Sequence, residues 1–436
     1  MKKGVVVILV LLAAIVLVSP AIVGRLAEKS MDENLNWAAT EAGDLTVTSE
    51  HFDRGWFSSE GRHRVELGEG RLVGTLRAMG GNVNPDELPV LIINTRIDHG
   101  LIPLGSIGSE GGSLSPGLGN AESTVQVEMP DGQLVDLPGM IYSKISLGGE
   151  LRSSYQLEPG ARQVDDANIA WGKTEINVDT NPVSGKVVFD GNIGSFSVGD
   201  GGKGVSLDGL SFDGHQQPTK YGIAVGDVAV SLGRFSTDDG AGGGVGEMSF
   251  DATTNIDDGK VGGDASLKMA MTGVPQFGDV SFDMAMTLDG ADAAAMGRLQ
   301  VLADAADANA DPMALYATME SDLKQLFAAG FEFSFDKLDV TLPMGTITSV
   351  VAFSFAEEDP ATFEWTSLLL STEASVDLSI PAELVETFAQ GSPEAAMVIG
   401  GGYLVKRGDV YVTKAQLKKG LLTVNGAPIP IPLGQF

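Results

Sequence analysis

The chain has 436 residues, of which 57 are glycine and none is cysteine, and its formal net charge is −30. This charge argues against nucleic-acid binding, which requires clustered Lys and Arg, and against an electrostatic hold on anionic lipid. Without cysteine there are no disulfides and no thiol chemistry. The fold must therefore be stabilised by core burial and by the hydrogen bonds of its sheets.

The first 24 residues have the pattern of a membrane anchor. Lys2 and Lys3 precede 21 residues without a charge, Gly4 to Gly24, and Arg25 ends the run. As a helix, this run is about 30 Å long, which matches the hydrocarbon core of a bilayer. We therefore predict a single-pass anchor at residues 1–24 in a bacterial inner membrane. The positive end marks the cytoplasmic side, so the bulk of the chain is expected in the periplasm.

A cleaved signal peptide is the alternative interpretation of the same residues. Lys2 and Lys3 would be its basic region, and Ser19-Pro20-Ala21 would be its small-residue cleavage site, so the protein would be secreted to the periplasm after cleavage near Ala21. Both interpretations place the rest of the chain outside the cytoplasm. The absence of cysteine from a large exported protein suits a bacterial envelope.

The remaining sequence predicts a mainly β protein with some helix, of the α+β class. Residues 25–42 have helical periodicity and are expected to form a juxtamembrane helix. From residue 43 to 290, apolar residues alternate with polar ones in short runs bounded by turn residues, as in Val228-Ala-Val230-Ser-Leu232. Period-2 alternation without intervening helices predicts a large antiparallel sheet with one apolar and one polar face.

A helical insertion is predicted at residues 291–330, divided near Asp311-Pro312 because proline suits a helix start. Residues 331–436 form a second β-rich part, expected to be continuous with the first. Short helices are predicted at 381–390 and 393–401, followed by a meander with a turn at Asn425-Gly426. The proline-rich tail from Ala427 is expected not to continue the ladder.

Three short motifs together resemble a known family. They are Phe52-Asp-Arg54-Gly55-Trp56-Phe57, Leu88-Pro-Val-Leu with Ile97-Asp98-His99-Gly100, and a terminal group that ends in Leu422-Thr423-Val424-Asn425-Gly426. With the apolar N-terminus, this pattern resembles the YdgA-like family of bacterial envelope proteins, a family of unknown function. It is more loosely similar to AsmA-like proteins. The resemblance implies an inner-membrane-anchored, periplasmic, β-rich protein and implies no chemistry.

The residues give no catalytic, cofactor or metal site. Of the four histidines, His51 and His63 flank the Trp56 turn and would be the one pair able to meet across a hairpin, but polar surface or turn contacts are the ordinary roles for them. Asp307-Ala-Asn309-Ala-Asp311 opens like a calcium loop but lacks its glycine and its final glutamate. Gly199 to Gly204 fits G-x-G-x-x-G, yet a strand pattern follows it, so we expect a hairpin turn. Neither a cofactor nor a metal is predicted.

Eight residues are candidates for a structural or contact role: Arg54, Gly55, Trp56, Phe57, His99, Gly100, Asn425 and Gly426. The Arg54–Phe57 cluster fits either a buried corner or a contact with a membrane or partner. The sequence favours a non-enzymatic binding or scaffold protein that holds lipid acyl chains on an apolar sheet face. The alternatives are a protein–protein scaffold or homo-oligomer without a small ligand, and an envelope hydrolase that uses paired carboxylates.

Overall fold

A computed structural model of the chain describes most of residues 45–430. The described ranges are 45–54, 58–68, 90–99, 119–128, 132–146, 150–164, 167–181, 183–200, 203–237, 244–274, 277–305, 312–389 and 393–430. The predicted anchor and juxtamembrane helix, residues 1–42, lie outside them. Within these ranges no helix is both long and apolar enough to cross a membrane. The chain forms two compact units, Met1–His215 (unit 1) and Gln216–Phe436 (unit 2).

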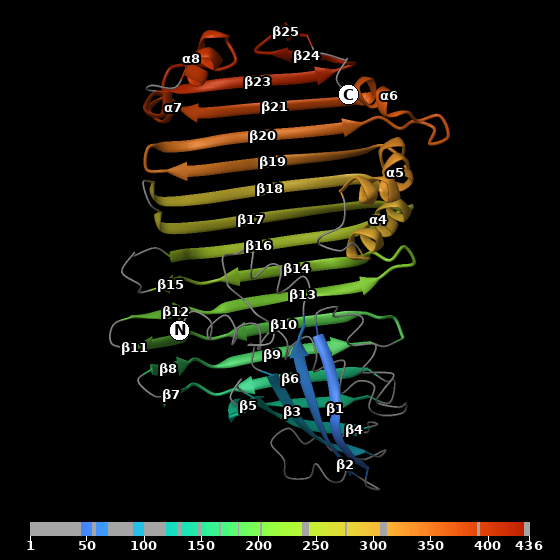
Figure 1. The fold of residues 1–436 in the computed structure, drawn as a ribbon, viewed down its shortest axis with the longest axis vertical. Helices are drawn as coiled ribbons and strands as arrows, with labels where there is room; N and C mark the ends of the chain where they lie inside the picture. Colours follow the sequence, from blue (N-terminus) through green and yellow to red (C-terminus); the bar gives the residue numbers. More distant parts are fainter. Residues whose placement is uncertain are drawn as a thin grey trace. The chain divides into compact units, whose positions relative to one another are not determined.

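Unit 1 is built from antiparallel strands, and its described residues contain no helix (Figure 1). The first ten strands are β1 Leu45–Arg54, β2 Ser58–Leu67, β3 Val90–His99, β4 Gly119–Glu128, β5 Leu134–Ile145, β6 Leu151–Leu157, β7 Gly160–Val164, β8 Ala167–Trp171, β9 Thr174–Thr180 and β10 Val187–Ile193. They are followed by β11 Phe196–Asp200, β12 Lys203–Leu207 and β13 Leu210–Pro218, which crosses the boundary between the units. Neighbours pair in the order β1-β2-β3-β4-β5-β6-β9-β10, and β7, β8, β11 and β12 pair in turn beside them.

Gly172 and Gly194 lie side by side where two neighbouring segments of unit 1 pass from one strand to the next. The Gly172 N–H donates to the carbonyl oxygen of Ser195 at 2.6 Å, and the Gly194 N–H donates to that of Lys173 at 2.9 Å. A Cβ at Gly194 would lie 2.6 Å from the Lys173 oxygen, a distance that no side chain tolerates. Glycine is therefore required where β8 gives way to β9 and β10 to β11, because the two backbones approach too closely for a side chain.

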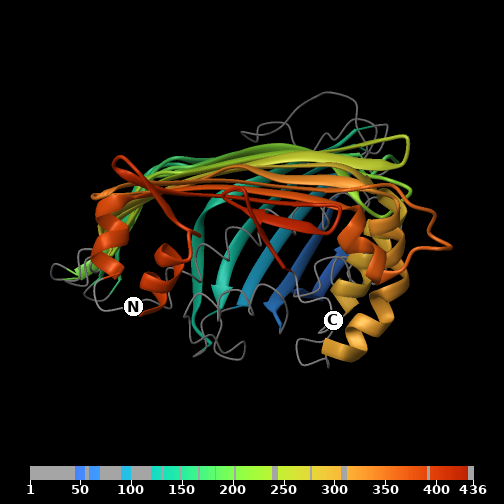
Figure 2. The same ribbon diagram turned by 90° about the horizontal axis from the view of Figure 1, so that it is seen from above.

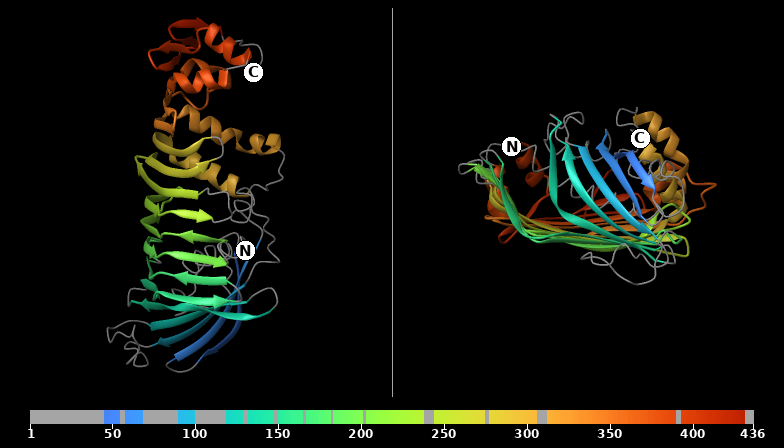
Figure 3. Two further views of the ribbon diagram at one scale, coloured as in Figure 1. Left: turned by 90° about the vertical axis from the view of Figure 1, so that its left-hand side faces the viewer. Right: turned by 90° about the horizontal axis from the view of Figure 1, so that it is seen from below.

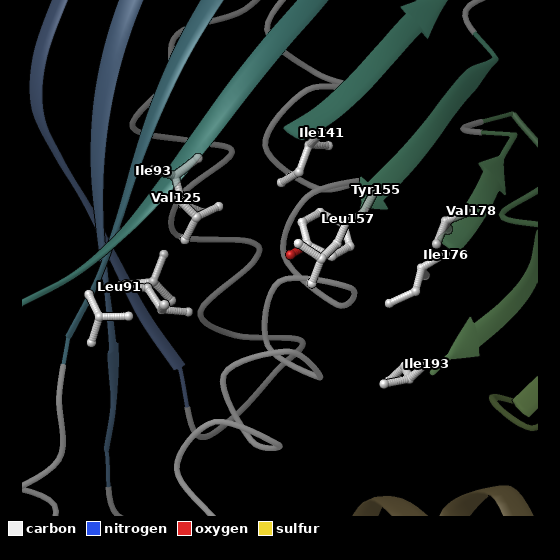
Figure 4. Close-up of a cluster of buried hydrophobic side chains, with 11 residues drawn as sticks. Leu91, Ile93, Val125, Ile141, Tyr155, Leu157, Ile176, Val178 and Ile193 are labelled. Atoms are coloured by element: carbon white, nitrogen blue, oxygen red, sulfur yellow. The ribbon is translucent and has the colours of Figure 1, made fainter. Parts of the chain in front are cut away.

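One face of unit 1 carries a buried apolar cluster (Figure 4). Alternate residues of adjacent strands supply it, since residues two apart lie on the same face. Its buried members are Val65, Leu91, Ile93, Val125, Val127, Ile141, Tyr155, Leu157, Ile176, Val178 and Ile193. The Tyr155 hydroxyl donates to the Pro138 carbonyl oxygen at 2.8 Å, and burial raises the pKa of Tyr155 to about 12. This cluster is the larger of the two buried apolar clusters in the described part of unit 1.

His63 lies on the same face as the cluster and is fully buried, with 0% of its surface exposed. Neither ring nitrogen has a hydrogen-bond partner among the residues that the structure describes. The residues opposite it are Ser49 on β1 and Ile93 on β3, so neither neighbouring strand places a charge there. Burial without a partner disfavours the charged imidazolium and lowers the pKa of His63 to about 4.

Unit 2 is a longer antiparallel sheet, and its strands run in sequence order with few interruptions (Figure 1). The strands are β14 Ala224–Leu232, β15 Phe235–Thr237, β16 Gly244–Asp257, β17 Lys260–Val274, β18 Gly278–Asp292, β19 Phe331–Leu342, β20 Gly345–Phe355, β21 Thr372–Pro381, β22 Val405–Arg407, β23 Val410–Lys418, β24 Leu421–Val424 and β25 Ala427–Ile429. They pair in the order β14-β16-β17-β18-β19-β20-β21-β23-β24-β25, with β15 on β16 and β22 on β23.

Five helices connect strands of unit 2, namely α4 Ala293–Ala305, α5 Pro312–Ala328, α6 Trp365–Ser371, α7 Ala382–Ala389 and α8 Pro393–Gly400. The described residues thus confirm a mainly antiparallel β fold with a few helices. Helices α4 and α5 lie within the stretch 291–330, and α5 begins at Pro312 as expected. The Asp292 carboxylate accepts a hydrogen bond from the Ala295 N–H at 2.7 Å, which caps the first turn of α4.

The expectation that the tail from Ala427 leaves the ladder is wrong. Residues Ala427–Ile429 form β25 and pair with β24, with Thr423 opposite Pro428 and Leu422 opposite Ile429. A proline is tolerated in an edge strand because its missing N–H can face away from the only neighbour.

Gly297 allows α4 to pack against the backbone of Tyr221. A Cβ at Gly297 would lie only 1.9 Å from the carbonyl oxygen of Tyr221. We predict that Gly297→Ala lowers the free energy of unfolding by about 1–3 kcal/mol, because α4 must move away from Tyr221. Gly400 in α8 has no atom within 4 Å of a Cβ, so Gly400→Ala should be neutral or stabilise by up to about 1 kcal/mol. Urea denaturation of both variants measures the difference, and equal effects would contradict the packing.

His63 makes the stability of unit 1 depend on pH. The unfolded imidazole has the ordinary pKa of 6.5 and binds a proton before the folded one does, at about 4. Stability should therefore fall as the pH drops from 6.5 to 4, by about 3 kcal/mol in total. We predict that His63→Leu removes this part of the pH dependence, whereas a His51→Leu control at an exposed site retains it. The free energy of unfolding measured at pH 7 and at pH 4 tests this prediction. An equal loss of stability between the two pH values in both variants would contradict it.

Candidate functional site

The most distinctive surface of unit 2 is the apolar face of its sheet, which we call the floor. Three rows of residues follow one another across the strands by register. They are Val228, Ala252, Ala265, Met286, Phe335, Val351 and Val376; then Val230, Phe250, Leu267, Met284, Leu338, Ser349 and Leu378; then Leu232, Met248, Met269, Phe282, Val340, Ile347 and Ile380. None of these positions is charged, because each strand alternates apolar and polar residues and the rows take the apolar set.

Helices α4 and α5 wall the floor at one end of the strands. The buried residues Ile223, Val261, Ala291 and Ala293 form a cluster there, and Met296 of α4 and Leu326 of α5 pack against it. The Phe327 ring of α5 lies 5.0 Å from the ring of Phe355 and 5.6 Å from that of Phe331, between ring centroids. Figure 3 shows α4 and α5 on one side of the unit 2 sheet.

Helix α7 walls the opposite end of the strands. Leu384 of α7 is buried with Val280 of β18 and Leu342 of β19, and Met271, Val340 and Ile347 pack around them. Figure 2 shows the two groups of helices at opposite ends of the strands and on the same side of the sheet. Helices therefore flank the floor at both ends of the strands, and we call the floor between them the trough.

Between the walls the large apolar residues of the floor are not buried, whereas the small residues Ala265 and Ser349 are. Leu267, Met269, Phe282, Met284 and Met286 are all half-buried, although each is a large apolar residue in the middle of a long sheet. None of them belongs to a buried hydrophobic cluster among the described residues. The helices thus cover the ends of the strands and leave the central rows in partial contact with solvent.

The opposite face of the same strands is polar. Thr287 donates to Asp336 at 2.7 Å, and Lys414 and Lys418 form ion pairs with Asp377 and Glu373 at 2.8 and 2.9 Å. These side chains are largely exposed, so each ion pair adds little to stability. The two faces of the sheet therefore differ in chemistry. Water solvates the polar face as it does an ordinary protein surface, whereas the floor is apolar.

The candidate contact residues do not gather into one site in the described parts of the chain. Arg54 ends β1 opposite Ser59, and His99 ends β3 opposite Gly119. Gly55, Trp56, Phe57 and Gly100 lie outside the described residues. For Arg54 and His99 the structure therefore gives only the backbone pairing.

Asn425 and Gly426 form the turn between β24 and β25, where Asn425 has a φ of +50° and Gly426 a φ of +82°. The Asn425 side chain donates to the carbonyl oxygens of Gly402 and Tyr403 at 2.9 and 3.1 Å, and its oxygen accepts from the Lys414 N–H at 2.9 Å. The described contacts give Asn425 a structural role, because it holds the segment before β22 against β23.

The histidines and the glycine motif do not form a site either. His51 is exposed and contacts Asp53 at 2.9 Å, whereas His63 is buried without a partner, so the two do not meet. The prediction of a surface role is wrong for His63, because its position in β2 falls on the apolar face. Gly199 pairs with Gly204 across the β11–β12 hairpin, which confirms the hairpin interpretation.

The described residues contain no group of three His, Asp or Glu side chains that could hold a metal ion. Residues 306–311, with the calcium-loop-like Asp307 to Asp311, lie outside the described ranges. Within the described part of unit 2, the half-buried floor differs in chemistry from the polar face of the same strands. Sequence reasoning predicted an apolar face, but it did not single out its central Met and Phe residues; their alternation was the only signal.

Comparison with known proteins gives a family but no function. A search of curated proteins and a search of solved structures found no match. The model of a bacterial protein family of unknown function, DUF945, matches residues 1–432. Because the match covers nearly the whole sequence, the chain belongs to this family of bacterial proteins, DUF945.

Proposed function

We propose that this chain is a non-enzymatic, membrane-anchored protein of the bacterial envelope that binds lipid acyl chains in the trough of unit 2. The observation that carries the proposal is the half-buried, uncharged floor between two helical walls. Large exposed apolar surfaces are uncommon on soluble proteins and mark sites for apolar ligands, partners or membranes.

The hydrophobic effect supplies the binding energy. Each methylene group moved from water onto the floor gains about 0.8 kcal/mol when it is fully buried. The methionines of the floor suit acyl chains of varied shape, since their unbranched side chains adapt to irregular surfaces. A chain of lipid needs no hydrogen bonds from these rows, and the rows offer almost none.

The direction of the trough also suits a long ligand. Helices close the floor at the ends of the strands, so a bound chain must lie across the strands rather than along them. Eight neighbouring strands, β14, β16–β21 and β23, span about 33 Å at the usual spacing of about 4.8 Å. That width accommodates an extended acyl chain lying along the floor.

The location follows from the N-terminus. Residues 1–24 have the length and charge pattern of an inner-membrane anchor, and such an anchor would place the trough in the periplasm beside a source of lipid. Family membership adds a bacterial origin. Binding without catalysis fits the three rows of the floor, which carry no acid or base and only one hydroxyl, that of the buried Ser349.

Replacing Met284 with Glu tests the site, with Ala285→Glu as the matched control. The two residues are adjacent in β18 and both half-buried, but Met284 lies on the floor and Ala285 on the polar face. We expect Met284→Glu to weaken binding of an environment-sensitive fluorescent fatty acid at least tenfold, because binding would bury the new carboxylate. Ala285→Glu should bind as the wild type does.

Thermal unfolding of the same variants controls for stability. If the floor is open, Met284→Glu should leave the melting temperature nearly unchanged, since its carboxylate can reach water. If Met284→Glu lowered the free energy of unfolding by several kcal/mol, part of the chain would have to cover the floor, and the proposal would be wrong. Absence of fatty-acid binding by the wild type would also contradict it and would favour a protein-binding scaffold.

A further inference from the structure

The C-terminal end of unit 2 reverses the charge of the chain. Residues 393–430 contain five basic residues and two acidic ones, a net charge of +3 within a protein whose net charge is −30. The basic residues are Lys406, Arg407, Lys414, Lys418 and Lys419. This segment forms α8 and the edge strands β22 to β25, beyond β21.

Two of these cations are available to a ligand. Lys406, Lys414 and Lys418 form ion pairs with Glu386, Asp377 and Glu373. Arg407 and Lys419 are exposed and have no ion pair with any described residue. Arg407 is the last residue of β22, opposite the start of β23, and Lys419 lies in the turn that follows β23. The positive charge is therefore spread along the edge rather than gathered at one point.

Exposed apolar side chains accompany each free cation. At the end of the sheet where β23 begins (Figure 1), Met397 of α8 is 72% exposed, and Tyr403, which precedes β22, is 43% exposed. Near Lys419, Leu421 of β24 is 56% exposed and Leu370 of α6 is 63% exposed. A Cβ at Gly420 would touch Leu370 at 2.9 Å, so the Leu370 and Leu421 positions lie side by side. Figure 1 shows α6, α8, β24 and β25 around the last strands of unit 2.

We propose that this edge of unit 2 docks on the surface of an anionic lipid bilayer. Arg407 and Lys419 would contact lipid phosphates, while Met397, Tyr403, Leu370 and Leu421 would enter the boundary between headgroups and acyl chains. Exposed apolar residues next to unpaired cations suit a membrane surface, because a bilayer offers a charged layer over an apolar one. The net charge argued against such contact, but that argument fails locally.

Charge selects the bilayer over a second copy of the chain. Two copies that met at this edge would bring the same cations together, whereas an anionic bilayer would pair these cations with phosphates. The inference goes beyond the proposed function, since docking depends on none of the floor residues. Failure of acyl-chain binding and failure of docking can therefore be told apart.

Because the chain has no cysteine, single cysteines can report on the contact. The full chain, with its N-terminal segment held in a nanodisc of phosphatidylcholine, carries an environment-sensitive fluorophore at Met397→Cys or Leu421→Cys. Val301→Cys on α4, 62% exposed and away from this edge, is the matched control. Vesicles of phosphatidylcholine alone, or mixed with phosphatidylglycerol, are then added.

The fluorescence at positions 397 and 421 should rise and shift to the blue with phosphatidylglycerol vesicles only, while position 301 stays unchanged. The double variant Arg407→Gln and Lys419→Gln should weaken the apparent affinity about 30-fold, since each cation near a membrane surface contributes about 1 kcal/mol. The exposed Lys268→Gln on β17 should have no such effect. Added salt should also weaken docking.

Three results would overturn the proposal. One is an equal response to vesicles with and without phosphatidylglycerol. Another is unchanged affinity of the double variant. The third is self-quenching of the labels at 397 or 421 before vesicles are added, which would show that a second copy occupies this edge.

Discussion

The exposure of one sheet face is the constraint on which the structure of unit 2 depends. Every long strand from β14 to β23 alternates apolar and polar residues, so one face is apolar across the whole sheet. Helices α4, α5 and α7 bury that face only where strands begin and end. The central rows keep hydrophobic surface that folding has not removed from water, and this surface is available to a ligand.

The same alternation of apolar and polar residues leads to different burial in the two units. In unit 1 the apolar side chains are buried in two clusters, one from β2 to β10 and a smaller one from β3 to β6. Burial there extends to His63, whose ring nitrogens lack partners and whose pKa is lowered as a result. In unit 2 the corresponding residues between the walls are half-buried and include several methionines. Burial in unit 1 gives stability, whereas partial exposure in unit 2 gives a surface for binding.

Local patterns in the sequence predicted most of the secondary structure. The period-2 runs became strands, Pro312 began α5, and Asn425-Gly426 formed a turn with positive φ at both residues. The edge strand at Ala427–Ile429 was missed because proline was read as a breaker, although an edge strand tolerates it. The boundary at His215 falls inside β13, where composition does not change.

The candidate site depended on information that the sequence does not contain. Alternation identifies an apolar face, but it does not tell whether helices will cover that face fully or only at its ends. His63 falls on the apolar face through its register with Ser49 and Ile93, and register is set by pairing between distant strands. Arg407 and Lys419 differ from the other three cations of the edge because those three form ion pairs, and ion pairs depend on the folded structure.

The polar face and the terminal edge give the acidic charge of the chain a physical reading. Most carboxylates lie on exposed strand positions and turns, where they keep the polar face solvated and oppose association of copies through that face. Arg407 and Lys419, which have no ion pair with any described residue, lie in the last strands of unit 2, and exposed apolar residues lie in the same part of the unit. The apolar floor and the basic edge of unit 2 are thus separate surfaces. We expect acyl chains to contact the floor and an anionic bilayer to contact the edge.

The most direct test of the central claim is mass spectrometry of the full chain purified from bacterial membranes in mild detergent, with a photo-crosslinker placed at Met269 or Met286. The account predicts lipid retained by the chain and acyl chains crosslinked at both positions. A chain free of lipid, or crosslinked there only to protein, would contradict it.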